Sequence, residues 1–178
     1  MSDGRANPTY DFQTQRDMGE RYEKTVLARV SEVLDTSIEY LSYESMPQAQ
    51  LSGVDALTAN NTGIDVKVQR AHHITTGNLP FEVWSDFGNQ TPGWIYTGQS
   101  DLIVWAYCDK ESNSLLETGY LMWKRDALIE WFNQHKDSFR RVTIDNDSYN
   151  AVVSLVPLIT IPDNFLSYFR VTMPTDND

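Results

Sequence analysis

The sequence predicts one α/β domain in which a mixed β-sheet is flanked by helices. Its length of 178 residues suits a single domain with a sizeable core. Hydrophobic residues make up 40% and charged residues 22% of the chain, as in globular proteins. Segments with helical and strand-like patterns follow one another in the order helix, three or four strands, helix, strand. We expect the domain to span residues 1–178, with flexible tails at about 1–12 and 174–178.

The first predicted element is a helix from about residue 14 to residue 34. Its apolar residues recur at intervals of three and four, which is the spacing of one helical face. Residues 35–50 are polar, include a proline and predict a loop. The apolar positions of the helix are Met18, Tyr22, Val26, Val30, Val33 and Leu34.

Strand patterns dominate the rest of the chain. Segments 52–58 and 64–71 predict a pair of strands joined by "ANNTG", whose asparagines and glycine accept the positive φ angles of a tight connection. The run at 101–108 is apolar on both faces and predicts a central strand. Further predictions are strands at 79–85, 115–123 and 149–158, a helix at 124–135 and a short helix within 162–170.

Charge and cysteine content exclude several classes of protein. A net charge of −11 argues against strong non-specific binding to nucleic acid. It is compatible with a metal-dependent enzyme whose cation neutralises local carboxylates, and with an acidic protein that mimics nucleic acid. Cys108 is the single cysteine, so an intrachain disulfide is excluded. The polar amino-terminal segment and the lack of a long apolar run predict a cytoplasmic protein with no membrane partner.

The most informative segment is the pair of strands around residue 60. Because side chains two apart share one face of a strand, Asp65, Lys67 and Gln69 project together. Ile64 and Val66 alternate with them and point toward the opposite face, with Val68. Taken alone, this is the pattern of a half-buried strand with a solvated polar face.

Asp55 on the neighbouring strand makes the pattern more specific. The connection can bring Asp55 opposite or diagonal to Asp65, where two carboxylates repel each other unless a cation joins them. Hard oxygen ligands of this kind suit Mg²⁺ or Mn²⁺. Lys67 beside them could orient a water molecule or stabilise charge that develops on phosphorus.

The arrangement Asp55…Asp65-Val66-Lys67 resembles the PD-(D/E)XK nuclease superfamily, which includes restriction endonucleases and Holliday-junction resolvases. The resemblance implies a restriction-endonuclease-like αβββαβ core and Mg²⁺-dependent hydrolysis of phosphodiester bonds. Asp55 and Asp65 match the metal-binding acidic positions and Lys67 matches the catalytic lysine. Gln69 matches a polar position that follows the lysine in some members.

The resolvase-like branch of the superfamily also implies an acidic ligand on the first helix. In that branch a glutamate follows a glycine by four residues, which Gly19 and Glu23 reproduce. Glu23 also shares a helical face with apolar residues, and a partly buried carboxylate favours a cation. Glu20 is the alternative ligand. Val54 departs from the family pattern, since a proline often precedes the first aspartate.

Other residues are weaker candidates for contacts with substrate. Arg70 and His72, with His73, form a small basic patch after the second strand of the pair that could contact a phosphate backbone. Glu82 could be a further metal ligand if its face of the strand meets the site. Trp94, Tyr96 and Gln99 lie in a segment that could form a substrate wall or fill the core.

These observations predict a metal-dependent nuclease of phage or microbial type, with DNA as the expected substrate. A homodimer or a protein partner is expected, because an acidic monomer holds DNA poorly. The alternative is a non-catalytic protein, either a nuclease fold that serves as an interaction module or an acidic nucleic-acid mimic. Binding of a divalent cation would distinguish the two.

Overall fold

The computed structural model describes residues 12–42, 45–46, 48–49, 52–109, 114–146 and 149–170. The helices are α1 (Phe12–Leu34), α3 (Trp94–Thr97) and α4 (Arg125–His135), with short 3₁₀ helices η1 (Ala71–Thr76), η2 (Lys136–Ser138) and η3 (Leu158–Thr160). The strands are β1 (Ile38–Tyr40), β2 (Ala56–Thr58), β3 (Gly63–Arg70), β4 (Asn78–Asp86), β5 (Thr91–Pro92), β6 (Leu102–Asp109), β7 (Ser114–Trp123), β8 (Arg140–Asn146), β9 (Tyr149–Pro157) and β10 (Leu166–Arg170).

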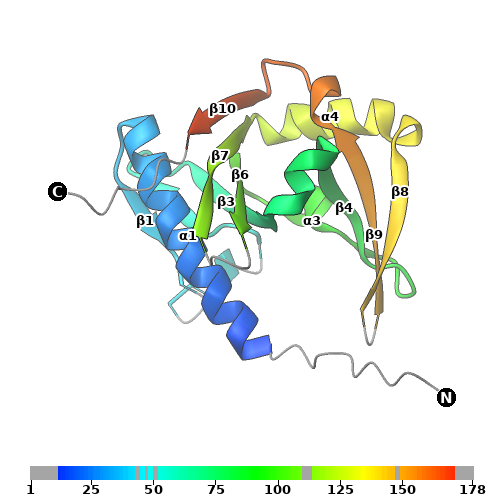
Figure 1. Cartoon of the computed structure of the whole chain (residues 1–178), viewed down its shortest axis with the longest axis horizontal. Helices are drawn as coiled ribbons and strands as arrows, with labels where there is room; N and C mark the ends of the chain where they lie inside the picture. The colour runs from blue at the N-terminus through cyan, green and yellow to red at the C-terminus, as the bar shows by residue number, and fades with distance from the viewer. Residues whose placement is uncertain are drawn as a thin grey trace.

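The described strands form two sheets (Figure 1). Sheet A has the order β1-β2-β3-β6-β7-β10, and sheet B has the order β5-β4-β9-β8. Strands β3 and β6 are parallel, and the other described pairs are antiparallel. The predicted α/β class with a mixed sheet is therefore confirmed.

Helix α1 covers one face of sheet A, as Figure 1 shows. Its buried residues Tyr22, Val26, Leu27 and Val30 pack against apolar side chains of β2, β3 and β6. The predicted helix at 14–34 is thus confirmed. Val33 was expected in this apolar face but is 49% exposed, because the last turn of α1 contacts the core through Leu34 instead.

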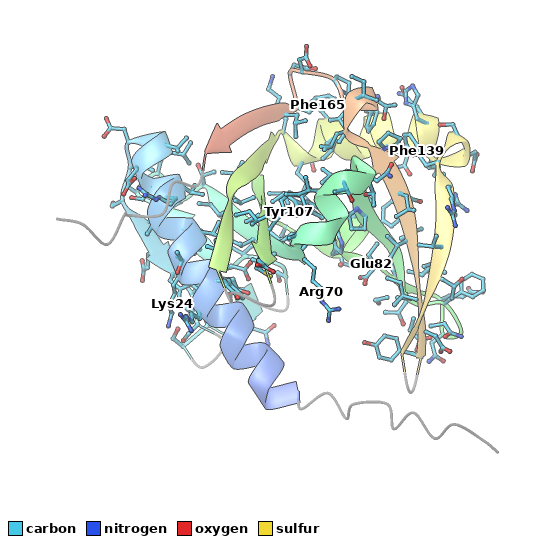
Figure 2. All side chains as sticks on the ribbon, in the orientation of Figure 1. Lys24, Arg70, Glu82, Tyr107, Phe139 and Phe165 are labelled. Carbon is cyan, nitrogen blue, oxygen red and sulfur yellow. The ribbon has the colours of Figure 1, made fainter. Side chains whose placement is uncertain are left out.

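The other face of sheet A is covered by α3, α4 and sheet B. Strand β6 is buried from Leu102 to Cys108, so the prediction of a central strand is confirmed. Its residues Ile103, Trp105 and Tyr107 point into this second core, where Phe81 of β4 and Phe132 of α4 meet them. Figure 2 places Tyr107 between β6 and α3. Sheet A is therefore a buried layer with a core on each side.

Several predicted elements lie elsewhere or have another structure. The strand at 79–85 exists as β4, but it pairs with β9 in sheet B and not with the hairpin of β2 and β3. The short helix predicted within 162–170 is wrong, because a turn at 163–165 leads into β10, which pairs with β7. Cross-strand pairing with β7 outweighs the local helix signals of a proline and a capping aspartate.

The sequence pattern also missed β1, β8 and the two-residue strand β5. The segment 35–50, predicted as a loop, contains β1, which pairs with β2. Strand β8 follows α4 and pairs with β9 along its whole length. Most of the predicted tails lies outside the described residues, although Phe12 already belongs to α1. Among the described helices, none combines the length and apolar character needed to cross a bilayer.

Candidate active site

The hairpin of β2 and β3 places Asp55 beside Asp65. Ala56 pairs with Ile64, and the amide of Asp55 donates to the carbonyl of Ile64 at 2.8 Å. In the connection, Asn61 has the positive φ angle of 59°, as its sequence predicts, whereas Gly63 does not need one. The predicted proximity of the two aspartates is confirmed: their carboxylates interact electrostatically.

Asp55 lies immediately before β2, and its side chain accepts a hydrogen bond that a backbone carbonyl would otherwise accept. Its Oδ2 accepts a hydrogen bond from the amide of Val66 at 2.7 Å. The side chain thus satisfies a β3 amide at the point where β2 no longer runs beside β3. This bond would be needed in any folded protein with this hairpin, so Asp55 has a structural role whether or not it also binds a ligand.

Burial strongly perturbs Asp55, which is 7% exposed. Loss of hydration, followed by repulsion from Asp65, raises its pKa from 3.8 to about 7. Glu23 also raises this pKa, while the Val66 amide and Lys67 lower it. The raised pKa shows that a second negative charge beside Asp65 is unfavourable, and a bound cation would relieve that cost.

Asp65 and Lys67 form a close ion pair on one face of β3, as the sequence predicts. Lys67 Nζ lies 2.7 Å from Asp65 Oδ1, and the two side chains are 26% and 1% exposed, respectively. Asp65 Oδ2 is buried with no hydrogen-bond partner among the described residues. This face of β3 is not the solvated strand face that the triplet would indicate if taken alone, because Trp94 of α3 and Arg125 of α4 lie beside it. Lys67 is the partly exposed member of the ion pair, so its side chain connects the buried Asp65 with solvent.

Trp94 and Arg125 complete the wall of the site. Lys67 Nζ lies 5.3 Å and the guanidinium carbon of Arg125 5.9 Å from the centroid of the Trp94 ring. Arg125, which is 4% exposed, donates to the carbonyls of Trp94 and Ile95. Burial lowers the pKa of Arg125, and the negative charge of Asp65 opposes that shift. The sequence indicated Trp94 but gave no signal for Arg125.

Two glycines allow α3 to approach the site this closely. A Cβ atom at Gly93 would collide with the backbone carbonyl of Glu82, and one at Gly98 would collide with the guanidinium of Arg125. The amide of Trp94 donates to Glu82 Oε1 at 3.3 Å. Glu82, considered above as a metal ligand, therefore anchors α3 to β4.

Glu23 reaches the site from α1. It is half-buried, it accepts a hydrogen bond from the hydroxyl of Tyr40 at 3.3 Å, and its charge acts on Asp55. The predicted proximity of Glu23 to the carboxylate pair is therefore supported by their electrostatic interaction. The side chain of Glu20, the alternative, lies outside the part of the chain that the structure describes.

The expected substrate contacts lie along β3 and beyond it. Gln69 follows Lys67 on the same face, and its Oε1 is buried without a hydrogen-bond partner among the described residues. Arg70 is exposed and extends from the end of β3, clear of the ribbon (Figure 2). His72 and His73 belong to η1, but their side chains lie outside the described residues.

Tyr96 and Gln99 do not join the carboxylates. The hydroxyl of Tyr96 donates to Asn133 of α4. Gln99 lines a hollow of about 940 Å³ between the turn of the hairpin and the start of α4. Both residues are exposed, and no contact of either with the aspartates is seen in the described part of the chain.

A divalent cation fits the donor chemistry of the aspartate pair. Among the described residues, no group of three His, Cys, Asp or Glu side chains lies close enough to hold a metal ion. Mg²⁺, however, is often bound by one or two carboxylates, with waters and substrate phosphates as its other ligands. The unpartnered Oδ2 of Asp65 and the raised pKa of Asp55 match such a site.

Neither protein-family models nor curated protein sequences give a significant match to this chain. The function of the site must therefore be inferred from its own geometry and chemistry. Two buried carboxylates, a partly exposed lysine and an adjacent buried arginine can bind a cation and stabilise negative charge near it.

Proposed function

We propose that this protein is a metal-dependent nuclease that hydrolyses phosphodiester bonds, with DNA as its substrate. The observation that carries the proposal is the buried pair of Asp55 and Asp65 with Lys67 bonded to Asp65. The Asp65–Lys67 ion pair needs one carboxylate, and the hydrogen bond from the Val66 amide to Asp55 could be accepted by an uncharged side chain. The second carboxylate raises the energy of the site unless a cation binds there, so its presence favours a ligand-binding role.

The order of elements in the chain supports a restriction-endonuclease-like fold. When η1, β4 and β5 are set aside, α1, β1, β2, β3, α3 and β6 follow one another in an αβββαβ order compatible with the resemblance, and β3 and β6 are parallel. These are not the elements that the sequence pattern assigned to it, because β4 and β5 form an insertion between β3 and α3 and belong to sheet B. The candidate site lies on β3, which is one strand of the parallel pair.

The roles of the residues follow from their positions. Asp55 and Asp65 would hold Mg²⁺ or Mn²⁺, with Glu23 as a further acidic group on the α1 side. When bound, the cation would supply positive charge next to the scissile phosphate and make a nearby water more acidic. Lys67 is held between Asp65 and Trp94, so its ammonium can orient the attacking water or stabilise the developing negative charge on phosphorus.

Substrate binding would depend on a small number of contacts. Gln69 and Arg70 follow Lys67 along β3. Together with His72, they could contact the phosphates next to the scissile one. With a net charge of −11, the rest of the protein repels DNA, so the cation contributes to binding as well as to chemistry. Because few cationic side chains contact the phosphates, cleavage should weaken only modestly as salt increases.

The direct test is cleavage of single-stranded, duplex and branched DNA in the presence of Mg²⁺ or Mn²⁺, with an RNA of the same sequence as a comparison. Asp65→Asn and Lys67→Met should each reduce the rate by roughly a hundredfold or more. Glu39→Gln, on an exposed position of β1, and Lys24→Met, on an exposed position of α1, are matched controls and should cleave like the wild type. Wild-type rates in the Asp65 and Lys67 variants would refute the assignment.

A non-catalytic interaction protein is the second candidate. The acidic composition favours it, as does the lack of a three-ligand group among the described residues. Calorimetric titration with Mn²⁺ separates the two candidates. The nuclease should bind Mn²⁺ and lose that binding in Asp65→Asn, whereas an interaction module built on a stable Asp65–Lys67 pair should show no Asp65-dependent binding.

A further inference from the structure

Strand β8 is an unusually open sheet edge. It lies at the margin of sheet B, and no other described strand pairs with its outer side (Figure 1). It has seven residues, compared with three for β1, two for β5 and five for β10, which are the other edge strands. It contains no proline or lysine, and its register with β9 has no bulge. Short length, proline, lysine and bulges are the features by which natural edge strands usually prevent pairing with another chain.

The backbone groups that point outward can be identified from the neighbouring strand. The carbonyl of Asn150 accepts from the amide of Phe87, so Asn150 turns its backbone groups toward β4. Asp145 pairs with Asn150, and its own N–H and C=O must then point away from β9. Because the direction alternates along a strand, Thr143 and Arg141 also present their N–H and C=O groups to the outside.

The sequence of β8 is complementary to itself when two copies run antiparallel. If Thr143 lies opposite Thr143 of a second copy, Arg141 lies opposite Asp145, and Val142 lies opposite Ile144. The three residues with outward backbone groups then form the hydrogen-bonded pairs of the new ladder. We propose that two copies of this chain associate through β8 in this register, which joins the two B sheets into one continuous sheet.

The side chains on both faces of β8 fit this arrangement. Arg141 and Asp145 share one face, so each would meet an opposite charge across the two-fold axis. Arg141 is 44% exposed and contacts Asp137 at 3.3 Å, and this exposed pair leaves it accessible to a second carboxylate. On the other face, Ile144 is 46% exposed and would be covered by Val142 of the second copy. The polar and apolar pairs thus match in the same register.

Charge reversal tests the register in the full-length protein. Sedimentation equilibrium should be measured at about 0.15 M salt, because each chain carries a charge of −11. The wild type should form a dimer. Arg141→Asp and Asp145→Arg should each weaken it by about tenfold or more, since each places like charges opposite one another. The double variant should restore dimerisation, because the opposite charges then face each other in exchanged positions.

Thr143→Lys provides an independent test of the register. It places two ammonium groups opposite each other at the centre of the interface, so it should weaken dimerisation. Thr143 is exposed, so the substitution should leave the fold intact, and circular dichroism verifies this for every variant. A wild type that remains monomeric up to about 1 mM would overturn the proposal. So would a folded double variant that dimerises no better than its parent single variants. Neither outcome depends on nuclease activity.

Discussion

Replacing Asp55 by asparagine should remove a large part of the pH dependence of stability. The wild-type carboxyl has a pKa of about 7 in the folded protein, chiefly because of burial and then because of Asp65. Its pKa in the unfolded chain is close to 3.8. The folded state therefore binds this proton more tightly than the unfolded state does. That contribution to stability is complete below the unfolded pKa and is lost as the pH rises through about 7.

The size of the effect follows from the difference between the two values. Each unit of pKa difference corresponds to about 1.4 kcal/mol. In the absence of metal, the free energy of unfolding of the wild type should fall by roughly 2–3 kcal/mol between about pH 5 and about pH 8, relative to Asp55→Asn. Asparagine can still accept the hydrogen bond from Val66 through its amide oxygen, so the variant keeps the backbone contact and loses only the titration.

Urea denaturation in the presence of a chelator measures this difference. Both proteins should be unfolded at several pH values, and their free energies of unfolding should be compared at each one. The two curves should diverge as the pH rises, with the wild type becoming the less stable of the two. Parallel curves would refute the proposed electrostatic state of Asp55. Added Mn²⁺ should reduce the loss at high pH in the wild type if the aspartate pair binds the cation.

Three further substitutions, with Gly77→Ala as a control, test the packing around the site, and urea denaturation measures each. Gly93→Ala should destabilise the protein by about 2 kcal/mol or more, because the new Cβ meets the backbone of Glu82. Gly77→Ala, where φ is 63° and no atom lies within 4 Å of the new Cβ, should cost only about 1 kcal/mol. An equal cost at the two glycines would contradict the close approach of α3. Arg125→Met should cost about 3 kcal/mol by leaving two carbonyls without their donor, and a neutral result would exclude that role. Phe81→Ala should cost about 3–5 kcal/mol through a buried cavity, and a loss below 1 kcal/mol would contradict its central position.

The central part of the candidate site was accessible from sequence because it depends on local rules. Strand alternation places Asp65 and Lys67 on one face, and a short connection brings Asp55 next to them. The helical face that carries Glu23 follows from a period of 3.6 residues. These relationships involve neighbouring positions on one or two elements, where periodicity is a reliable guide.

The cover over the site could not be predicted, since it depends on distant parts of the chain. Arg125 begins α4, yet it contacts carbonyls of α3 through the interior. Its sequence neighbourhood is that of an ordinary helix start. The alternating pattern of β4 predicted a strand but not its sheet, because a strand pattern carries no information about a partner as remote as β9. The burial of Asp65 follows from this second layer.

The pairing of β4 with β9 has a consequence for the order in which the protein can assemble. Phe81 of β4 lies opposite Ser154 of β9, so sheet B cannot close until nearly all of the described chain has been synthesised. Contacts so distant in sequence form slowly, since a long loop must be closed first. The β2–β3 hairpin and α1, by contrast, can meet early. We therefore expect the carboxylates to come together before sheet B closes.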